Sequence, residues 1–437
     1  MTSKPNSLCM APWTHTYLSP QTERRLCCAS REPAQNFQQY IDTTAGTGKY
    51  IPVTLEQHWN SEHMKDVRRR MMAGETLSEC DVCNNKLLNS SVYRDYFWHL
   101  FGHKYEQAMQ STDVTGHTTL KPVSWDYRFS NLCNFKCRMC GDKLSSQWES
   151  ELKKMNAVAP EYWEQLDNLW MKPDVKKEIT KFQDTVIEQE FAQAVEEHRV
   201  EEVYWVGGEP LMYEQHWRYM KRIIELGDGD KVYARYNTNL SRVNYAGCDL
   251  YTDILAHIRD WQICASLDGT GAVGEYIRTG LDYEQWKQNF QQGLAVQKHK
   301  RQMRIDFTLT LPGLTEIVNI VKLAKQFDVE LLTKMTFAFD PSIPMSPQIL
   351  PRHLLNAWLD DIEQELGHDI HYVANLFQQL RSQPTFEEHW PDTYLEGQRK
   401  ARHTTDNLEK FRKDQLRLTD ILAQRPTVQK WWNSINA

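Results

Sequence analysis

The stretch "FSNLCNFKCRMCGDK" at residues 129–143 places three cysteines, Cys133, Cys137 and Cys140, within eight residues. Thiols this close can form a disulfide, bind zinc or ligate an iron-sulfur cluster. The CxxxCxxC spacing lets a short loop offer three thiolates to a cubane and leaves the fourth iron without a protein ligand. A zinc site needs a fourth cysteine or histidine, and the next candidate after Cys140 is His198. The spacing alone therefore favours a cluster and leaves zinc open.

The rest of the chain limits the choice. The 437 residues carry a formal charge of -7, which argues against a general polyanion binder, so we expect no nucleic-acid partner. No window approaches the roughly 20 apolar residues of a membrane span, and the first residues lack the apolar core of a signal peptide. We therefore expect a cytoplasmic protein with no membrane partner. A reducing compartment favours metal, cluster or catalytic roles for the ten cysteines over structural disulfides.

The fold prediction comes from short β-type runs that alternate with long helical stretches. Most of these runs end in or just before Gly, Asn, Asp, Pro or Cys, so polar chemistry collects at the carboxyl ends of the strands. This pattern predicts an α/β protein with a parallel sheet or an open barrel, whose active site lies at that edge. The six predicted strands are residues 123–130, 201–208, 231–238, 261–269, 304–311 and 334–340.

We predict three regions along the chain. Residues 1–115 hold five cysteines and form a cysteine-organised module. Residues 118–341 form the barrel, with a helical insertion at about 144–199 that is longer than one crossover helix needs. Residues 342–437 form a helix-rich C-terminal region.

With the cysteine loop after its first strand, the chain resembles the radical S-adenosylmethionine (radical SAM) enzymes. The resemblance implies a partial (β/α)6 barrel, a 4Fe-4S cluster on the three cysteines, and S-adenosylmethionine bound to the open iron. The second strand ends in "VGGEP", where the family has a Gly-Gly-Glu motif that contacts the amino group of this cosubstrate. The residues assigned to this contact are Gly207, Gly208, Glu209 and Pro210.

Further cosubstrate contacts follow from the same resemblance. "ASLDG" resembles the family's ribose and carboxylate contact, through Ser266 and Asp268, and Arg278 in "YIRTG" is placed toward the cosubstrate carboxylate. "NTNL" resembles a Thr-Asn-Gly motif and assigns Asn239, although Leu240 replaces the glycine. Next to Cys140, Met139 stands where relatives often carry an aromatic residue over the adenine.

The N-terminal region resembles the auxiliary-cluster modules called SPASM and twitch. In these modules a β-hairpin carries a cysteine at either end, and a helix leads into a C-x-x-C pair. The modules usually follow the barrel, whereas this one precedes it. Adjacent residues on a strand point to opposite faces, so only one of Cys27 and Cys28 is expected to reach the site, and we assign Cys27. The predicted ligands of a second 4Fe-4S cluster are Cys9, Cys27, Cys80 and Cys83, and a structural zinc on the same thiolates is the alternative.

The resemblance implies reductive cleavage of S-adenosylmethionine to a 5'-deoxyadenosyl radical that takes hydrogen from a substrate. A saturated auxiliary cluster favours oxidation or cross-linking, with an electron donor such as flavodoxin or ferredoxin. We expect a peptide or protein substrate, because the large insertion and the helical tail offer more surface than a small ligand requires, and acidic helices could meet a basic leader segment. The alternatives are a dehydrogenase or epimerase of a small molecule, and a non-catalytic iron-sulfur redox sensor. Cys264 lies two residues before Ser266 and shares its face. We consider it as a buried inert thiol or as a catalytic hydrogen-atom donor.

Overall fold

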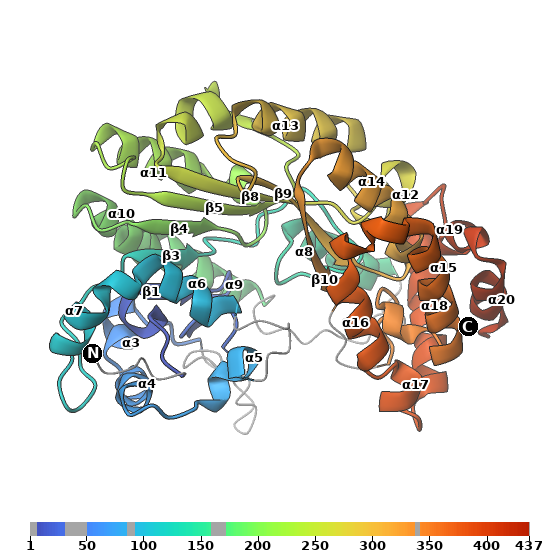
Figure 1. Cartoon of the computed structure of the whole chain (residues 1–437), viewed down its shortest axis with the longest axis horizontal. Coiled ribbons are helices and arrows are strands. Elements are labelled where there is room, and N and C mark those ends of the chain that lie inside the picture. The colour runs from blue at the N-terminus through green and yellow to red at the C-terminus, as the bar shows by residue number, and fades with distance from the viewer. Residues whose placement is uncertain (1–6, 31–49, 85–91, 159–171, 337–340, 437) are drawn as a thin grey trace. The chain divides into compact units, whose positions relative to one another are not determined.

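The computed structural model describes residues 7–30, 50–84, 92–158, 172–336 and 341–436 (Figure 1). Two compact units make up the chain. Unit 1 comprises Met1–Leu132, Leu166–Arg235 and Thr252–Trp261, and unit 2 comprises Cys133–Gln165, Tyr236–Tyr251 and Gln262–Ala437. In the described part of the chain, no helix combines the length and apolar character that crossing a membrane requires.

The fold is α/β and contains an eight-stranded, mostly parallel, open sheet, as expected for a partial radical SAM barrel. The strand order is β10-β9-β8-β5-β4-β3-β1-β2, and β6-β7 form a separate two-stranded sheet (Figure 1). The strands are β1 His15–Leu18, β2 Arg24–Arg25, β3 Ser124–Tyr127, β4 Glu202–Trp205, β5 Tyr233–Thr238, β6 Asn244–Tyr245, β7 Cys248–Asp249, β8 Asp260–Ser266, β9 Met303–Leu309 and β10 Glu330–Met335.

All six predicted barrel strands are present as β3, β4, β5, β8, β9 and β10. The last one begins at Glu330, four residues before the predicted start, because its parallel pairing with β9 starts at Glu330 opposite Arg304. Residues 337–340, the end of that prediction, lie outside the described residues.

In unit 1 the N-terminal hairpin belongs to the main sheet. Strand β1 pairs antiparallel with β2 and parallel with β3, with His15 opposite Ser124. Ser61 caps helix α4, since its side chain accepts a hydrogen bond from the Met64 amide. The helices are α1 Ala11–Thr14, α3 Leu55–Trp59, α4 Glu62–Met72, α5 Asp81–Asn84, α6 Val92–Phe101, α7 Tyr105–Gln110, α9 Pro173–Phe182, α10 Glu188–Glu196 and α11 Glu214–Glu225.

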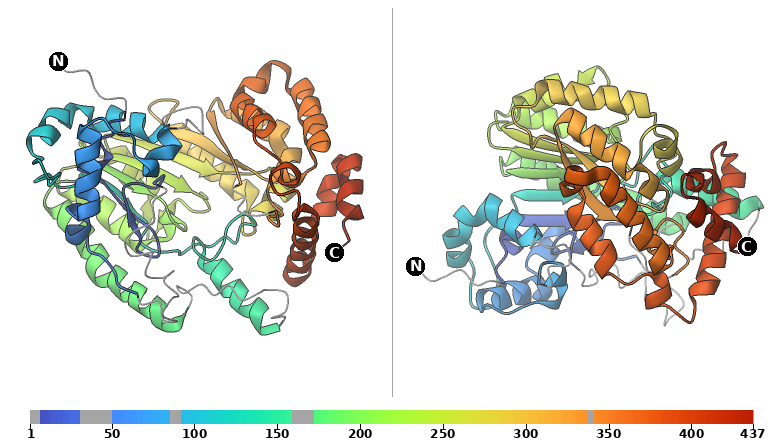
Figure 2. Two further views of the ribbon diagram at one scale, coloured as in Figure 1. Left: turned by 90° about the horizontal axis from the view of Figure 1, so that it is seen from below. Right: turned by 45° about the vertical axis from the view of Figure 1, so that its right-hand side comes forward.

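Unit 2 contains the cysteine loop, strands β6, β7, β9 and β10, the later parts of β5 and β8, and the C-terminal helices. Those helices form one contiguous group, coloured orange to red in Figure 2. The described residues after 341 are mostly helical, and the three predicted regions with their limits stay predictions. The helices of this unit are α8 Ser146–Val158, α12 Gly271–Ile277, α13 Tyr283–Val296, α14 Ile317–Phe327, α15 Arg352–Leu366, α16 Ala374–Ser382, α17 Phe386–His389, α18 Tyr394–Arg412, α19 Leu418–Ile421 and α20 Pro426–Ser434.

Candidate active site

The cysteine loop is fixed by residues at the start of α8. The Ser145 hydroxyl donates to the Phe135 carbonyl at 2.6 Å, and the Trp148 indole N–H donates to the Cys137 carbonyl at 2.6 Å. Cys133 and Cys137 are buried, whereas Cys140 is exposed. The loop therefore offers two enclosed thiols and one open thiol from a rigid backbone.

The thiols of Cys137 and Cys140 are within hydrogen-bonding reach of each other. Their shared hydrogen bond is the main cause that lowers the pKa of the Cys140 thiol, and the nearby Arg278 guanidinium acts in the same direction. Arg278 Nη1 lies 3.9 Å from Cys137 Sγ. A cation beside two adjacent thiols stabilises the thiolate form that a metal requires.

Asp268 and Arg278, which the sequence assigned to separate cosubstrate contacts, form an ion pair with 2.7 Å between Arg278 Nε and Asp268 Oδ2. The other oxygen, Asp268 Oδ1, accepts from the Thr308 amide at 2.8 Å. Asp268 is fully buried, and burial raises the pKa of its carboxyl although Arg278 opposes this shift. The pair links the end of β8 to the cysteine loop within unit 2.

The "GGEP" turn in unit 1 packs against the residues just before Cys133. Gly207 has a φ of +131°, and a Cβ on Gly208 would lie 2.3 Å from the Leu132 carbonyl oxygen. The Glu209 amide donates to that same oxygen at 2.7 Å. Both positions therefore require glycine. The glycines here let the turn approach the protein's own backbone, which is a different reason from the close approach to a ligand expected from the sequence.

Glu209 is buried at the end of that turn, with 1% of its surface exposed. Its side chain accepts a hydrogen bond from the Leu211 amide at 3.1 Å, and Pro210 begins the short helix Pro210–Met212. A carboxylate held in this way has a fixed orientation.

The "NTNL" segment adopts the backbone that its missing glycine would have favoured. Leu240 has a φ of +52° and is fully buried, and its carbonyl accepts from the Asn289 amide group at 2.8 Å. Asn239 Nδ2 donates to Asn134 Oδ1 in the cysteine loop at 2.9 Å. Asn239 therefore positions the loop, in addition to any contact with a cosubstrate.

Strand β8 places Cys264 and Ser266 on one face together with Gln262, because side chains alternate along a strand. Cys264 is buried, with its sulfur 3.7 Å from Gln262 Oε1. Met139 is half-buried in the loop, and the structure records no specific contact for it.

No site residue was assigned to β9 from the sequence, but the structure shows a polar group around Asp306 on this strand. Asp306 stands opposite Ser266 in the β8-β9 register. Its Oδ2 accepts from Asn237 at 2.8 Å and forms an ion pair with Lys334 at 2.7 Å. The only signal in the sequence was an acidic residue inside an otherwise apolar run.

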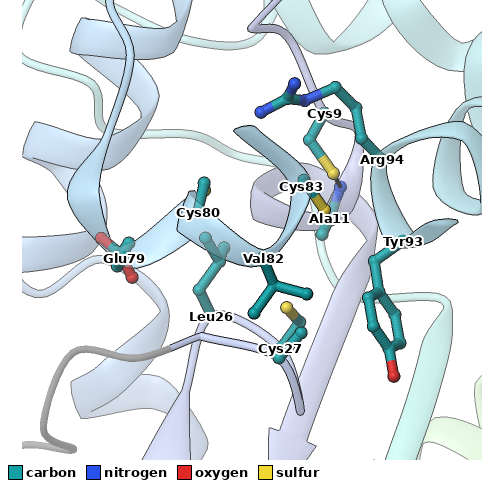
Figure 3. A pocket seen from close by; sticks show the side chains of 11 residues that line it. Cys9, Ala11, Leu26, Cys27, Glu79, Cys80, Val82, Cys83, Tyr93 and Arg94 are labelled. Carbon is teal, nitrogen blue, oxygen red and sulfur yellow. Dashed lines mark hydrogen bonds between the residues drawn. The ribbon is translucent and has the colours of Figure 1, made fainter. Parts of the chain in front are cut away.

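A second cysteine group lines a pocket in unit 1 (Figure 3). Its volume is about 340 Å³ counting the open mouth. Leu26 and Val82 contribute apolar walls. The four cysteines in the lining are Cys9, Cys27, Cys80 and Cys83.

Cys27 and Cys28 have different neighbours. Burial is the main cause that raises the pKa of Cys27, and the further causes include Cys9 and Cys80 of the pocket. Burial also raises the pKa of Cys28, but its charged neighbours are Asp126 and Arg128, and its hydrogen-bond partner is the Tyr93 hydroxyl. Cys27 therefore faces the pocket, and Cys28 faces the end of β3.

The pocket also holds charged side chains that the sequence analysis did not single out. Arg94 is 9% exposed; its Nη2 donates to Asn84 at 2.6 Å, while its buried Nε has no hydrogen-bond partner. Glu79 accepts from the Ser30 hydroxyl at 3.1 Å. One guanidinium beside four thiols can offset the negative charge of thiolates. Within the described residues, no group of three or more His, Cys, Asp or Glu side chains is gathered closely enough to be recognised as a metal site.

The fold is α/β, and the cysteine loop, the "GGEP" turn and the "ASLDG" segment lie at or just after the carboxyl ends of the parallel strands β3, β4 and β8. The model of the radical SAM superfamily matches residues 127–324. The chain therefore contains a radical SAM domain over these residues, and that family implies a 4Fe-4S cluster and S-adenosylmethionine as cofactors. No curated protein matches the sequence.

Among solved structures, the chain is similar to Streptococcus suis SuiB at 13% identity, with 51% of this chain and 58% of that chain covered and a TM-score of 0.28. It is similar to native anSMEcpe with bound AdoMet at 15% identity, 55% and 60% coverage and a TM-score of 0.32. It is also similar to Streptococcus suis SuiB bound to precursor peptide SuiA, at 13% identity, with 69% of this chain and 69% of that chain covered and a TM-score of 0.32. The chain thus spans less than two thirds of the first two structures.

Proposed function

We propose that Cys133, Cys137 and Cys140 hold the 4Fe-4S cluster of the radical SAM domain. When bound, the cluster and S-adenosylmethionine supply the reductive cleavage that yields a 5'-deoxyadenosyl radical. The donor set suits this assignment, because the loop supplies three thiols, with the Arg278 guanidinium beside one of them. The exposed Cys140 lies on the accessible side of the loop. This arrangement is the observation that carries the proposal.

The chain's own residues would bind and orient the cosubstrate. In the proposed site, Glu209 accepts hydrogen bonds from the cosubstrate ammonium, and Arg278 attracts its carboxylate. Ser266 and Asp268 lie at or just after the end of β8 and serve the ribose, with Asn239 beside the loop. Gly207, Gly208 and Pro210 hold the backbone of the turn, and Met139 is assigned to the adenine side.

We propose a second iron-sulfur cluster in the unit 1 pocket, ligated by Cys9, Cys27, Cys80 and Cys83. The support is that four thiols line one cavity and that a buried guanidinium, Arg94, lies in the same lining. Four thiolates saturate a 4Fe-4S cluster, so this site would transfer electrons and would not bind substrate directly. Zinc on the same four thiols remains the alternative ligand, and iron and zinc analysis of the purified protein distinguishes the two.

The proposed reaction is oxidation or cross-linking of a peptide or protein side chain, with an electron donor such as flavodoxin or ferredoxin. The helical additions offer surface for a large substrate. The acidic side chains of α15 pair with cations of the same chain, Asp360 with Arg381, Asp361 with Arg425, and Glu365 with Lys322, so α15 is not the helix proposed to meet a basic peptide segment. Oxidation or epimerisation of a small molecule is the second candidate, and the polar Asp306–Lys334 pair beside Ser266 suits a polar substrate of either size.

The decisive experiment is cleavage of S-adenosylmethionine. Anaerobically reconstituted protein, reduced with dithionite, should form 5'-deoxyadenosine, measured by liquid chromatography. Absence of this product from protein that contains the loop cluster would contradict the proposed site.

Cys264 is proposed only as a candidate hydrogen-atom donor, and its buried position on β8 also suits an inert thiol. With a substrate in hand, Cys264→Ala should slow product formation if the thiol donates hydrogen. Unchanged turnover would remove this role.

A further inference from the structure

The end of α18 contributes three charged side chains that contact the surroundings of the cysteine loop. They are Glu409, Arg412 and Asp414, and we call these three residues the clamp. Asp414 lies just beyond Lys413, whose left-handed backbone (φ +58°) ends the helix. All contacts of the clamp described here lie within unit 2.

The first contact joins Arg412 to α8. The Arg412 and Glu151 side chains are 2% and 4% exposed, and Arg412 Nη2 lies 2.5 Å from Glu151 Oε2. Arg412 also donates to the Thr279 hydroxyl at 3.0 Å and lies over the Trp148 ring at 4.7 Å. On its other oxygen, Glu151 receives Lys136 at 2.6 Å. One buried carboxylate therefore links the clamp to the residue before Cys137.

The second contact reaches the residue after Cys137. Asp414 forms an ion pair with Arg138, whose side chain is only 1% exposed. The Arg138 guanidinium lies 3.7 Å from the centre of the Tyr276 ring, and its Nε donates to the Tyr276 carbonyl at 2.9 Å. The hydroxyl of Tyr276 donates to Glu409 at 2.7 Å. The clamp therefore holds the basic residues on both sides of Cys137.

The same residues align the loop with the segment that carries Arg278. The Lys136 amide donates to the Thr279 carbonyl at 2.9 Å, and the Arg138 amide donates to the Ile277 carbonyl at 2.8 Å. These two hydrogen bonds lie on either side of the contact between Cys137 and Arg278. A shift of residues 136–138 would therefore change the distance between this thiol and this guanidinium.

We propose that Arg412 and Asp414 are positioning residues that hold Cys137 against Arg278 and so shape the cosubstrate site. The inference rests on the proposed function, in which the loop holds the cluster. Loss of Asp414 removes the counter-ion of the buried Arg138, and loss of Arg412 leaves the buried Glu151 paired with Lys136 alone, so Arg138 or Glu151 would move toward water. The loop would move as well, because Arg138 is part of the loop and Glu151 forms an ion pair with its Lys136. This explains why a lysine and an arginine flank the middle cysteine.

The test compares Arg412→Met and Asp414→Asn with Arg402→Met. Arg402 lies on the same helix but pairs with Asp406 and the Trp432 carbonyl, so it is a matched control away from the loop. Reduced holoenzyme is titrated with S-adenosylmethionine while its EPR spectrum is recorded. We expect the apparent Kd to rise roughly 10-fold or more in the two clamp variants, which is typical when a residue that orients a ligand is lost. The Arg402→Met variant should match the wild type.

Two further measurements keep the proposal falsifiable. Thermal unfolding separates positioning from stability: a lower midpoint with a wild-type Kd in the folded protein would overturn the proposal. If the clamp variants fail to fold, Arg412→Lys decides, because lysine keeps the charge but loses the planar fork. A wild-type Kd in that variant would also overturn it. If S-adenosylmethionine leaves the EPR signal of the wild type unchanged, the proposed function itself fails.

Discussion

The two cysteine groups are built in opposite ways. The loop group takes three thiols from eight consecutive residues, and it is held by charged contacts such as that of the buried Arg138 with Asp414, 276 residues away. The pocket group takes four thiols from three segments spread over residues 9–83, and Leu26 and Val82 enclose it with apolar surface. A loop with an exposed thiol suits a site that must admit a cosubstrate. A pocket lined by four thiols suits a site that exchanges only electrons.

The largest expected effect tests whether the two groups hold separate clusters. Simultaneous replacement of Cys133, Cys137 and Cys140 by Ala should abolish cleavage of S-adenosylmethionine and reduce the iron content from about eight to about four atoms per chain. Iron analysis and 5'-deoxyadenosine formation provide the two measurements. The control is Cys248→Ala, at a buried cysteine of β7, which should keep the wild-type iron content and the wild-type formation of 5'-deoxyadenosine. Four irons in the intact protein would remove the second cluster.

The next effect separates the roles of the two groups. Cys27→Ala should leave cleavage of S-adenosylmethionine intact and reduce substrate turnover to background, because the substrate radical would lose its electron acceptor. Cys28→Ala is the matched control, since Cys28 faces Asp126 and Arg128 and not the pocket. The measurement is 5'-deoxyadenosine formed against product formed. A wild-type ratio in Cys27→Ala would show that the pocket is structural.

A smaller effect concerns the cosubstrate alone. Glu209→Ala should raise the Kd for S-adenosylmethionine about 10- to 150-fold, because a charge-assisted hydrogen bond contributes roughly 1.5 to 3 kcal/mol. Iron content should stay at the wild-type level, because Glu209 is not a proposed ligand. The Kd for S-adenosylmethionine is measured by equilibrium binding to the anaerobic holoenzyme. An unchanged Kd would show that the "GGEP" assignment is wrong.

The last comparison concerns the stability of the two units as a function of pH, and not their chemistry. Burial lowers the pKa of His15, His58 and His216, all in unit 1, to about 3. The unfolded chain binds these protons near the ordinary pKa of 6.5, so stability is complete above about pH 7 and falls as the pH drops toward 3. Each histidine should cost about 2 kcal/mol at pH 5.

Hydrogen exchange of the iron-free protein measures this acid effect. Between pH 7 and pH 5, unit 1 should lose protection before unit 2. His216 lies between Trp205 and Trp217, with ring centres 4.9 and 4.8 Å away, so His216→Phe should retain most of the packing and reduce the acid sensitivity. Equal loss of protection in both units would contradict the assignment.

Much of the fold could be predicted from the sequence because the residue types within a short segment indicate a strand. The runs that became β3, β4, β5, β8 and β9 are rich in β-branched and aromatic residues and end in turn residues. The pairing of β1 with β3 could not be read in this way. "HTYL" is only four residues long, and its partner is chosen by tertiary packing of the hairpin.

Candidate site residues could be proposed from the sequence where residue type and order alone carry the chemistry, as in the cysteine loop and the "GGEP" turn, and these assignments stay predictions. The partners of Lys136 and Arg138 were not, because nothing in the sequence near 136–138 indicates Glu151 or Asp414 as their counter-ions. The same holds for Arg94, which is one more basic residue until the fold brings it to the pocket.

During biosynthesis, β1 can pair with β3 only after the residues between them have been translated. His15 and Ser124, the first pair of that register, are 109 residues apart, so at 5–20 residues per second the ribosome needs roughly 5 to 20 s to supply the partner strand. During this interval Cys9 and Cys27, on either side of the nascent hairpin, are open to solvent and to oxidants. Any metal bound by all four pocket cysteines is acquired after Cys83 has been made, and slower translation of residues 30–124 should increase the fraction of chains with oxidised N-terminal thiols.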